Sequence, residues 1–236
     1  MSPQLPSTSL SSSEVRARQF YNHWMGGSSF TSVVGRLIFK LSGVVYSHTF
    51  IRVAGLNPGD KVLEIGCGMG TILTDAQRHV NSTESYLGID LSHQMVLRGK
   101  EKTPAVILKP VELIVGSALS LPLKSALFDV VLMSHVIKYL TDDQLDVVLE
   151  ESARVLKPGG RIVLWEFSPL FSPLITRLVV KYCSAQKLRP TSGLRRAMET
   201  AGYDDLKPFR IITPWLPWSN IAFAGRRNGC SGRVFI

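Results

Sequence analysis

The sequence predicts an α/β fold in which a parallel sheet carries helices on both of its faces. Two observations predict it: short apolar runs alternate with helical stretches from Lys61 onward, and a glycine-rich turn follows the first of these runs. Alternating strands and helices imply right-handed crossovers between parallel strands. With 236 residues and 45% apolar content, the chain can bury one sizeable core and is not a wholly disordered protein.

The first 60 residues predict two helices that precede the sheet. Residues 1–11 are expected to form a disordered tail rich in Ser and Pro. Ser11 and Glu14 have the S-x-x-E spacing of a capping box, which starts a helix by satisfying its free N–H groups. A second helix is predicted over 31–54, where apolar residues recur every three or four positions. Gly55 suits the end of that helix.

Each later element has a predicted range. The predicted strands are 62–65, 86–89, 111–115, 128–133 and 161–167, and the helices between them are 71–80, 92–102 and 142–156. The Lys-Pro-Gly-Gly segment at 157–160 is expected to stop the last of these helices. Beyond them, two more helices are predicted over 173–184 and 194–201, and two more strands over 209–213 and 221–225.

The segment most informative about function is Val-Leu-Glu-Ile-Gly-Cys-Gly-Met-Gly at 62–70, where a buried strand enters a turn with three glycines. Glycines let the backbone turn sharply and approach a ligand closely, and ligands of parallel sheets bind beyond the carboxyl ends of the strands. The spacing is G-x-G-x-G, whereas dinucleotide folds have G-x-G-x-x-G, and a phosphate P-loop would need a Lys that is absent. Glu64 would repel a pyrophosphate and favour a cationic ligand.

A second acidic residue, Asp90, ends the next predicted strand. Its carboxylate can accept hydrogen bonds from both hydroxyls of a ribose, or it can cap the following helix beside Ser92. With the glycine turn upstream at βαβ spacing, the ribose interpretation is favoured.

These residues resemble the class I S-adenosylmethionine-dependent methyltransferases of the type 11 group. Three further segments match their motifs: 115–123, which usually has an acid where Ser117 stands, 128–135, and 154–160. The resemblance implies a Rossmann-like, seven-stranded, mostly parallel sheet whose last strand, 221–225, is antiparallel. It also implies one methyltransferase domain over 12–225, made of an N-terminal helical lid (12–55), a cofactor-binding core (60–167) and a substrate-side region (168–225), followed by a basic tail (226–236).

The resemblance also implies the site. S-adenosylmethionine, released as S-adenosylhomocysteine, would lie on the glycine turn, with Glu64 supporting the turn and meeting the amino group, and Asp90 holding the ribose. Its implied contacts are Tyr21, Glu64, Gly66, Cys67, Gly68, Gly70, Asp90, Leu91, Met95, Ser117, Ala118 and Ser134. His135 is the candidate general base by its place after the fourth strand, with His23 second; a base helps when the acceptor is a hydroxyl or a carbon acid.

The segments expected to face the acceptor are apolar. They are the lid helices, the helix 173–184 and the loop with Trp215, Leu216 and Trp218, and their basic residues include Arg36, Lys40, Arg177 and Lys181. This composition predicts a lipophilic or aromatic small-molecule acceptor, enclosed by a lid or presented at a lipid surface by peripheral membrane contact. Trp-Glu-Phe-Ser-Pro at 165–169 is similar to the end of strand five in ubiquinone/menaquinone C-methyltransferases.

Two other functions stay open at this stage. The net charge of +9 indicates an anionic partner and fits an RNA- or protein-directed methyltransferase, and a non-catalytic cofactor-binding module would keep the same turn. A nucleic-acid partner is disfavoured because the Lys and Arg residues are dispersed and no Asn/Asp-Pro-Pro-Tyr follows strand four. Cys67, Cys183 and Cys230 have neither disulfide nor zinc spacing, no metal site is predicted, and the N-terminus is unlike a secretory signal, so a cytoplasmic protein is expected. The sequence does not indicate an oligomeric state.

Overall fold

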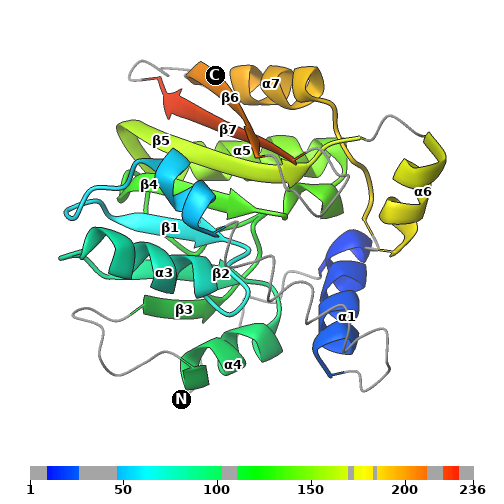
Figure 1. Cartoon of the computed structure of the whole chain (residues 1–236), viewed down its shortest axis with the longest axis horizontal. Helices are drawn as coiled ribbons and strands as arrows, with labels where there is room; N and C mark the ends of the chain where they lie inside the picture. The colour runs from blue at the N-terminus through cyan, green and yellow to red at the C-terminus, as the bar shows by residue number, and fades with distance from the viewer. Residues whose placement is uncertain are drawn as a thin grey trace.

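A single seven-stranded sheet forms the centre of the protein, with the strand order β3-β2-β1-β4-β5-β7-β6 (Figure 1). The computed structural model describes residues 10–26, 47–102, 111–169, 173–182, 185–211 and 220–228. The strands are β1 (Val62–Ile65), β2 (Tyr86–Asp90), β3 (Val111–Val115), β4 (Phe128–Ser134), β5 (Leu156–Phe167), β6 (Tyr203–Ile211) and β7 (Asn220–Arg227). β7 is antiparallel to both of its neighbours, and the other pairings are parallel. The predicted mostly parallel sheet with an antiparallel last strand is confirmed.

Helices cover both faces of this sheet, as the alternation predicted. They are α1 (Ser12–Gly26), α3 (Thr71–Val80), α4 (His93–Lys102), a single 3-10 turn η1 (Ile137–Tyr139), α5 (Asp142–Val155), α6 (Pro173–Tyr182) and α7 (Thr191–Thr200); residues 47–54 are also helical. One core cluster contains Leu149 of α5 and Met198 of α7. The other contains Phe50 and Leu73 of the helices 47–54 and α3.

The central strand β4 shows why the sequence forms a buried sheet. Val131 and Met133 belong to the cluster under α5 and α7, whereas Val130 and Leu132 belong to the opposite cluster. All four side chains are at most 1% exposed. Successive side chains of a strand point to opposite faces, so a strand covered on both sides needs an unbroken apolar run.

β5 and β6 begin several residues earlier than predicted, and β7 begins one residue earlier. β5 begins at Leu156, five residues before the predicted start, because Phe128 pairs with Leu156 and Val130 pairs with Arg161 across an irregular register. The Lys-Pro-Gly-Gly segment thus ends α5 and also forms the bulged start of β5. β6 begins at Tyr203 and not at 209; it lies at the edge of the sheet, where a proline and polar residues are tolerated.

The N-terminal predictions are confirmed where the structure describes them. Ser11 N–H donates to Glu14 Oε2 at 2.9 Å and Glu14 N–H donates to Ser11 Oγ at 3.3 Å, which is the predicted capping box of α1. The helix 47–54 ends at Gly55 with φ of +56°. Several predicted features lie outside the described residues: 1–9, 31–46 with Arg36 and Lys40, Cys183, the loop with Trp215, Leu216 and Trp218, and 229–236 with Cys230.

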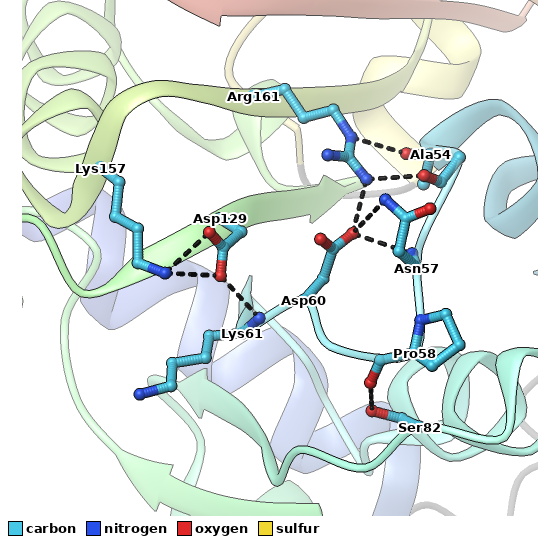
Figure 2. Close-up of polar contacts among 10 residues, drawn as sticks. Ala54, Asn57, Pro58, Asp60, Lys61, Ser82, Asp129, Lys157 and Arg161 are labelled. Carbon is cyan, nitrogen blue, oxygen red and sulfur yellow. Dashed lines mark hydrogen bonds and ion pairs between the residues drawn. The ribbon is translucent and has the colours of Figure 1, made fainter.

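A polar cluster joins the helix 47–54 to the amino ends of the central strands (Figure 2). Arg161 of β5 donates to the carbonyl oxygens of Ala54 at 2.9 Å and Gly55 at 2.7 Å, and it pairs with Asp60 at 2.8 Å. Nearby, Asp129 accepts from the Lys61 N–H at 2.9 Å. These contacts stabilise the amino ends of the strands. The glycine turn lies at the opposite, carboxyl ends, which are left for a ligand.

We expect Arg161→Lys to lower the free energy of unfolding by about 1–2 kcal/mol, because a lysine ammonium cannot reproduce the planar fork that reaches three acceptors. Urea denaturation followed by circular dichroism measures it. The matched control is Arg226→Lys, since Arg226 is 63% exposed at its side chain and only approaches Asp205 at 4.0 Å. Equal effects of the two substitutions would contradict the prediction.

Candidate functional site

The turn between β1 and α3 has a backbone that only glycine adopts without strain. Gly66, Gly68 and Gly70 have φ of +73°, +55° and +71°. A Cβ on Gly66 would lie 2.2 Å from Val136 Cγ2, and one on Gly70 would lie 2.9 Å from a methyl of Leu113. The predicted sharp turn is therefore present, and side chains at these positions would either distort the backbone or collide with neighbours.

Asp90 ties this turn to the end of β2. Its Oδ2 accepts from the Gly68 N–H and its Oδ1 accepts from the Ser92 N–H, both at 2.8 Å. The capping role and the turn-supporting role thus coexist, and each oxygen keeps a lone pair for a further donor. Burial raises the pKa of Asp90, and the two backbone hydrogen bonds oppose that rise. Asp90 is therefore a half-buried acceptor at the carboxyl end of the sheet.

Glu64 is a buried carboxyl in the middle of β1. It is 1% exposed, and among the described residues its Oε2 has no hydrogen-bond partner. Burial raises its pKa well above the ordinary range and the charge of Asp90 adds to the rise, whereas the backbone of Leu73 lowers it. A nearby cation would compensate this group. Burial likewise raises the pKa of the Cys67 thiol.

One cavity brings most of the predicted site residues together. Its walls include Tyr21, Glu64, Gly66, Cys67, Gly68, Asp90, Leu91, Met95, Ala118, Ser134 and His135. Gly70 and Ser117 were predicted too, but they do not line it: Gly70 packs against Leu113, and the Ser117 hydroxyl is bonded to Glu14. The side chain of His23, the second candidate base, lies outside the described part of the structure.

The sequence interpretation missed several residues of the cavity wall. Glu14, Ala17 and Arg18 of α1 line it beside Tyr21, and Val136, Tyr139 and Leu140 line it after β4. The spacing of the α1 residues is that of one helix face. This spacing was the signal available in the sequence, once the capping box had placed the start of the helix.

His135 lies among aromatic rings at the end of β4. Its ring centroid is 4.5 Å from that of Trp165 and 4.4 Å from that of Phe167. Its backbone has φ of +57°, a conformation that non-glycine residues seldom adopt. The His135 N–H donates to the Trp165 carbonyl oxygen at 2.8 Å. The neighbouring strand thus holds a strained backbone in place, as often happens at functional sites.

A buried carboxylate and a buried ammonium accompany this histidine. Glu166 Oε1 lies 3.4 Å from His135 Nδ1 and 3.5 Å from Lys138 Nζ. Burial alone would raise the pKa of Glu166, but Lys138 and His135 outweigh it and bring the pKa to about 2. Burial lowers the pKa of His135; Glu166 raises it and Lys138 lowers it further, so the net direction is downward. His135 is therefore a neutral imidazole at neutral pH.

Comparisons with known proteins identify a methyltransferase domain in this chain. A family model described as "Methyltransferase domain", of type 11, matches residues 63–164, which contain the glycine turn, Asp90 and His135. Residues 63–164 therefore form a class I S-adenosylmethionine-dependent methyltransferase domain. S-adenosylmethionine is the cofactor of this family, so the predicted family, enzyme class and cofactor are confirmed.

Relatives of this methyltransferase act on different acceptors. The demethylmenaquinone methyltransferase of Bacillus cereus is 29% identical over 184 residues, which span 67% of this chain and 77% of the relative. The geranyl diphosphate C-methyltransferase of Streptomyces coelicolor has the same fold, with a TM-score of 0.73 at 14% identity over 94% of this chain and 100% of that chain. Phosphoethanolamine N-methyltransferase 2 of Haemonchus contortus aligns with a TM-score of 0.65 at 15% identity over 78% of this chain and 52% of that chain.

The two buried glutamates should affect stability in opposite directions. At pH 7, Glu64→Gln is expected to leave the free energy of unfolding unchanged or raised, because it removes a charge that burial disfavours. Glu166→Gln is expected to lower the free energy of unfolding by about 3–5 kcal/mol, because it removes the carboxylate charge beside the buried Lys138 ammonium. Urea denaturation of both variants and of the wild type measures these effects.

The pH dependence of the same measurement separates the two carboxyls. The folded-state pKa of Glu64 is raised, so its penalty is present at high pH and is relieved as the pH falls toward 4.5; any advantage of Glu64→Gln should shrink with it. The folded-state pKa of Glu166 is lowered to about 2, so its contribution is present above about pH 4.5 and is lost as the pH falls toward 2. A destabilised Glu64→Gln variant at pH 7 would contradict this account.

Proposed function

We propose that this methyltransferase transfers the methyl group of S-adenosylmethionine to a lipophilic or aromatic small molecule by in-line displacement. The observation that carries the proposal is a neutral imidazole set among aromatic rings at an otherwise apolar end of the cavity. Val136, Tyr139 and Leu140 form that wall beside His135. Two of the relatives support it, because one is named for demethylmenaquinone and the other for geranyl diphosphate.

The cofactor's charge fits the acidic side of the cavity. Glu64 Oε2, buried and without a partner among the described residues, would accept the cofactor's ammonium group. Asp90 would accept the ribose hydroxyls with the lone pairs left by its two backbone donors. The glycine turn would let the backbone approach the cofactor closely, since side chains at 66 and 68 would intrude on Val136 and Met95.

Apolar residues that line the cavity near Asp90 suit the adenine ring of the cofactor. Leu91, Met95 and Ala118 line the cavity there, and Met95 is buried. On the acceptor side, Tyr21 from α1 packs edge-on against Tyr139 at 5.7 Å between ring centroids. We assign Tyr21 to the covering of the cofactor and Ser134 to its methionine end.

The reaction mainly requires the protein to align the acceptor with the methyl group and to provide one proton acceptor. When bound, S-adenosylmethionine supplies a methyl group that its positive sulfur has already activated. Glu166, with a pKa of about 2, is ionised and can only accept hydrogen bonds. His135 Nδ1 must therefore donate to Glu166, which leaves Nε2 of the neutral imidazole without a proton. Nε2 is then the base that takes the proton of a hydroxyl or carbon acid, and Glu166 fixes its tautomer.

The charges of the cavity wall disfavour a nucleic-acid acceptor. Among the described lining residues, Glu14, Glu64 and Asp90 are acidic, and Arg18 alone is a lysine or arginine. A phosphate backbone needs several basic contacts for affinity. RNA therefore serves as a comparison substrate in the activity assay described below.

Helix α6 supports an acceptor drawn from a lipid surface. Leu174 is 66% exposed, and Arg177 and Lys181 on the same helix are exposed as well. Apolar and basic residues together favour the boundary of an anionic bilayer. No helix among the described residues is long and apolar enough to cross a membrane.

Formation of S-adenosylhomocysteine across a panel of acceptors tests the proposal. We expect product with quinols, prenyl compounds or phenols, presented in detergent or vesicles, and none with structured RNA or a basic protein. Asp90→Ala is the control, because loss of the proposed ribose acceptor should weaken S-adenosylhomocysteine binding in calorimetry by roughly tenfold or more and reduce turnover. Turnover only with RNA or protein would overturn the acceptor class. Undiminished cofactor binding in Asp90→Ala would overturn the ribose assignment.

His135→Asn should lower kcat by roughly 10²–10⁴-fold while leaving the affinity for S-adenosylhomocysteine within about twofold of the wild type. Asparagine tolerates the positive φ at this position, so the backbone is preserved. In the wild type, activity should fall as the pH drops through a value below 6.5, because protonation of His135 removes the base.

Glu166→Gln serves as the positioning control for this prediction, measured below its melting temperature. Because Glu166 raises the pKa of His135, its loss should shift the acid limb of the pH–rate profile to lower pH, in addition to lowering kcat. A substitution that only destabilises the fold would not change the pH at which activity falls on the acid side of the profile. Full activity of His135→Asn on the accepted substrate would remove the general base from the mechanism.

A further inference from the structure

We infer that Glu14 of α1 accepts the hydrogen bond of the adenine amine, so that the lid helix itself completes the cofactor site. This inference rests on the cofactor placement proposed above and adds to it a residue that the turn and Asp90 do not supply. The inference rests on the position of the Glu14 carboxylate. It lies beside Ser117, at the end of the cavity proposed above to hold adenine.

Glu14, and not Ser117, faces the cavity. Ser117 follows β3, where the family usually has an acid, yet it does not line the cavity. Its hydroxyl donates to Glu14 Oε1, and its oxygen accepts from the Leu119 N–H at 3.1 Å. Glu14 lines the cavity together with Ala118 and Leu119. The carboxylate at this end of the site therefore comes from a residue 103 positions away in the sequence.

The hydrogen bonds of Glu14 leave it an acceptor. Oε2 accepts from both the N–H and the hydroxyl of Ser11, at 2.9 and 2.8 Å. Among the described residues, Oε1 accepts from Ser117 alone, so one of its lone pairs can take a further donor. The exocyclic amine of adenine is a donor, and a carboxylate accepts such a bond more strongly than a neutral oxygen does.

The position of Glu14 depends on how α1 docks. Gln144 of α5 donates from Nε2 to Ser11 Oγ at 3.0 Å and accepts from Ser13 Oγ at 2.9 Å. Gln144 also completes the capping box of α5 with Thr141. At the other end of α1, Ser92 Oγ donates to Asn22 Oδ1 at 3.0 Å. Figure 1 shows α1 beyond the arrowheads of β1 and β2, to the right of α4.

Lid docking and adenine binding should therefore favour each other. When α1 is docked, Glu14 is held ready by Ser11 and Ser117; when α1 is undocked, the adenine amine loses this acceptor. Because coupling between two events is reciprocal, a cofactor with the amine should stabilise the docked helix more than one without it.

The test is a binding cycle between Glu14 and the amine. Calorimetry measures the affinity of S-adenosylhomocysteine and of its 6-deamino analogue, in which hydrogen replaces the amine, for wild type, Glu14→Gln and Ser117→Ala. We expect the wild type to prefer S-adenosylhomocysteine by roughly tenfold or more. Glu14→Gln should reduce that preference to about twofold, because the amide keeps one oxygen for the helix cap and turns an NH₂ group elsewhere. Ser117→Ala should keep most of it.

Each other result overturns the inference. Equal weakening of both ligands in Glu14→Gln, with the preference retained, would make Glu14 a helix cap only. A preference lost in Ser117→Ala but kept in Glu14→Gln would assign the acceptor to Ser117. Failure of the wild type to bind S-adenosylhomocysteine would overturn the cofactor placement itself and this inference with it.

Hydrogen exchange of the wild type gives a second readout that needs no variant. S-adenosylhomocysteine should slow exchange of the amides in α1 more than the 6-deamino analogue does, with both ligands at saturating concentration. Equal protection by the two ligands would separate lid docking from the adenine amine and would contradict the inference.

Discussion

The whole site depends on how the ends of β1 and β2 are joined. The Gly66 and Cys67 N–H groups donate to the Ile89 carbonyl oxygen at 2.7 and 3.1 Å, and the Gly68 N–H donates to Asp90. These bonds fix the turn against the neighbouring strand before any ligand arrives. They also hold the Asp90 carboxylate still, so the ribose acceptor proposed above is already oriented and would need little further ordering.

Local patterns predicted the parts of the molecule that local physics determines. The ranges of β1, α3 and β3 were predicted to the residue, because short runs dominated by apolar residues indicate strands and a helix shows its own period. The glycine turn and Asp90 could also be recognised, since both lie within one βαβ unit. The start of β6 was missed because an edge strand with Asp204, Asp205 and Pro208 lacks the apolar run of a central strand.

Contacts between distant segments could not be predicted in this way. His135 was identified by its place after β4, but its partner Glu166 lies on the next strand, and only the fold brings the two within 3.4 Å. Glu14 had a clear local explanation as a helix cap, which concealed its second position in the cavity wall. Whether a residue with a structural role also faces a ligand depends on packing between elements, and a single sequence does not record that packing.

Glu64 and Glu166 differ in how their buried charges are compensated, and this difference affects the stability of the fold. Both carboxyls are buried, but Glu166 has Lys138 beside it and Glu64 has no basic side chain among the causes of its pKa shift. Burying an uncompensated carboxyl is unfavourable unless a ligand cation completes it. The same group can thus weaken the empty protein and strengthen the loaded one, a relation that other proteins show as a trade-off between stability and function.

The Gln144 side chain forms hydrogen bonds at the N-termini of two helices. It caps α5, which packs into the core, and it also holds the first turn of α1. If the product leaves by undocking of α1 while α5 stays in place, the Gln144 amide would have to exchange the two serines for water. A single uncharged side chain would then influence how long the product stays bound.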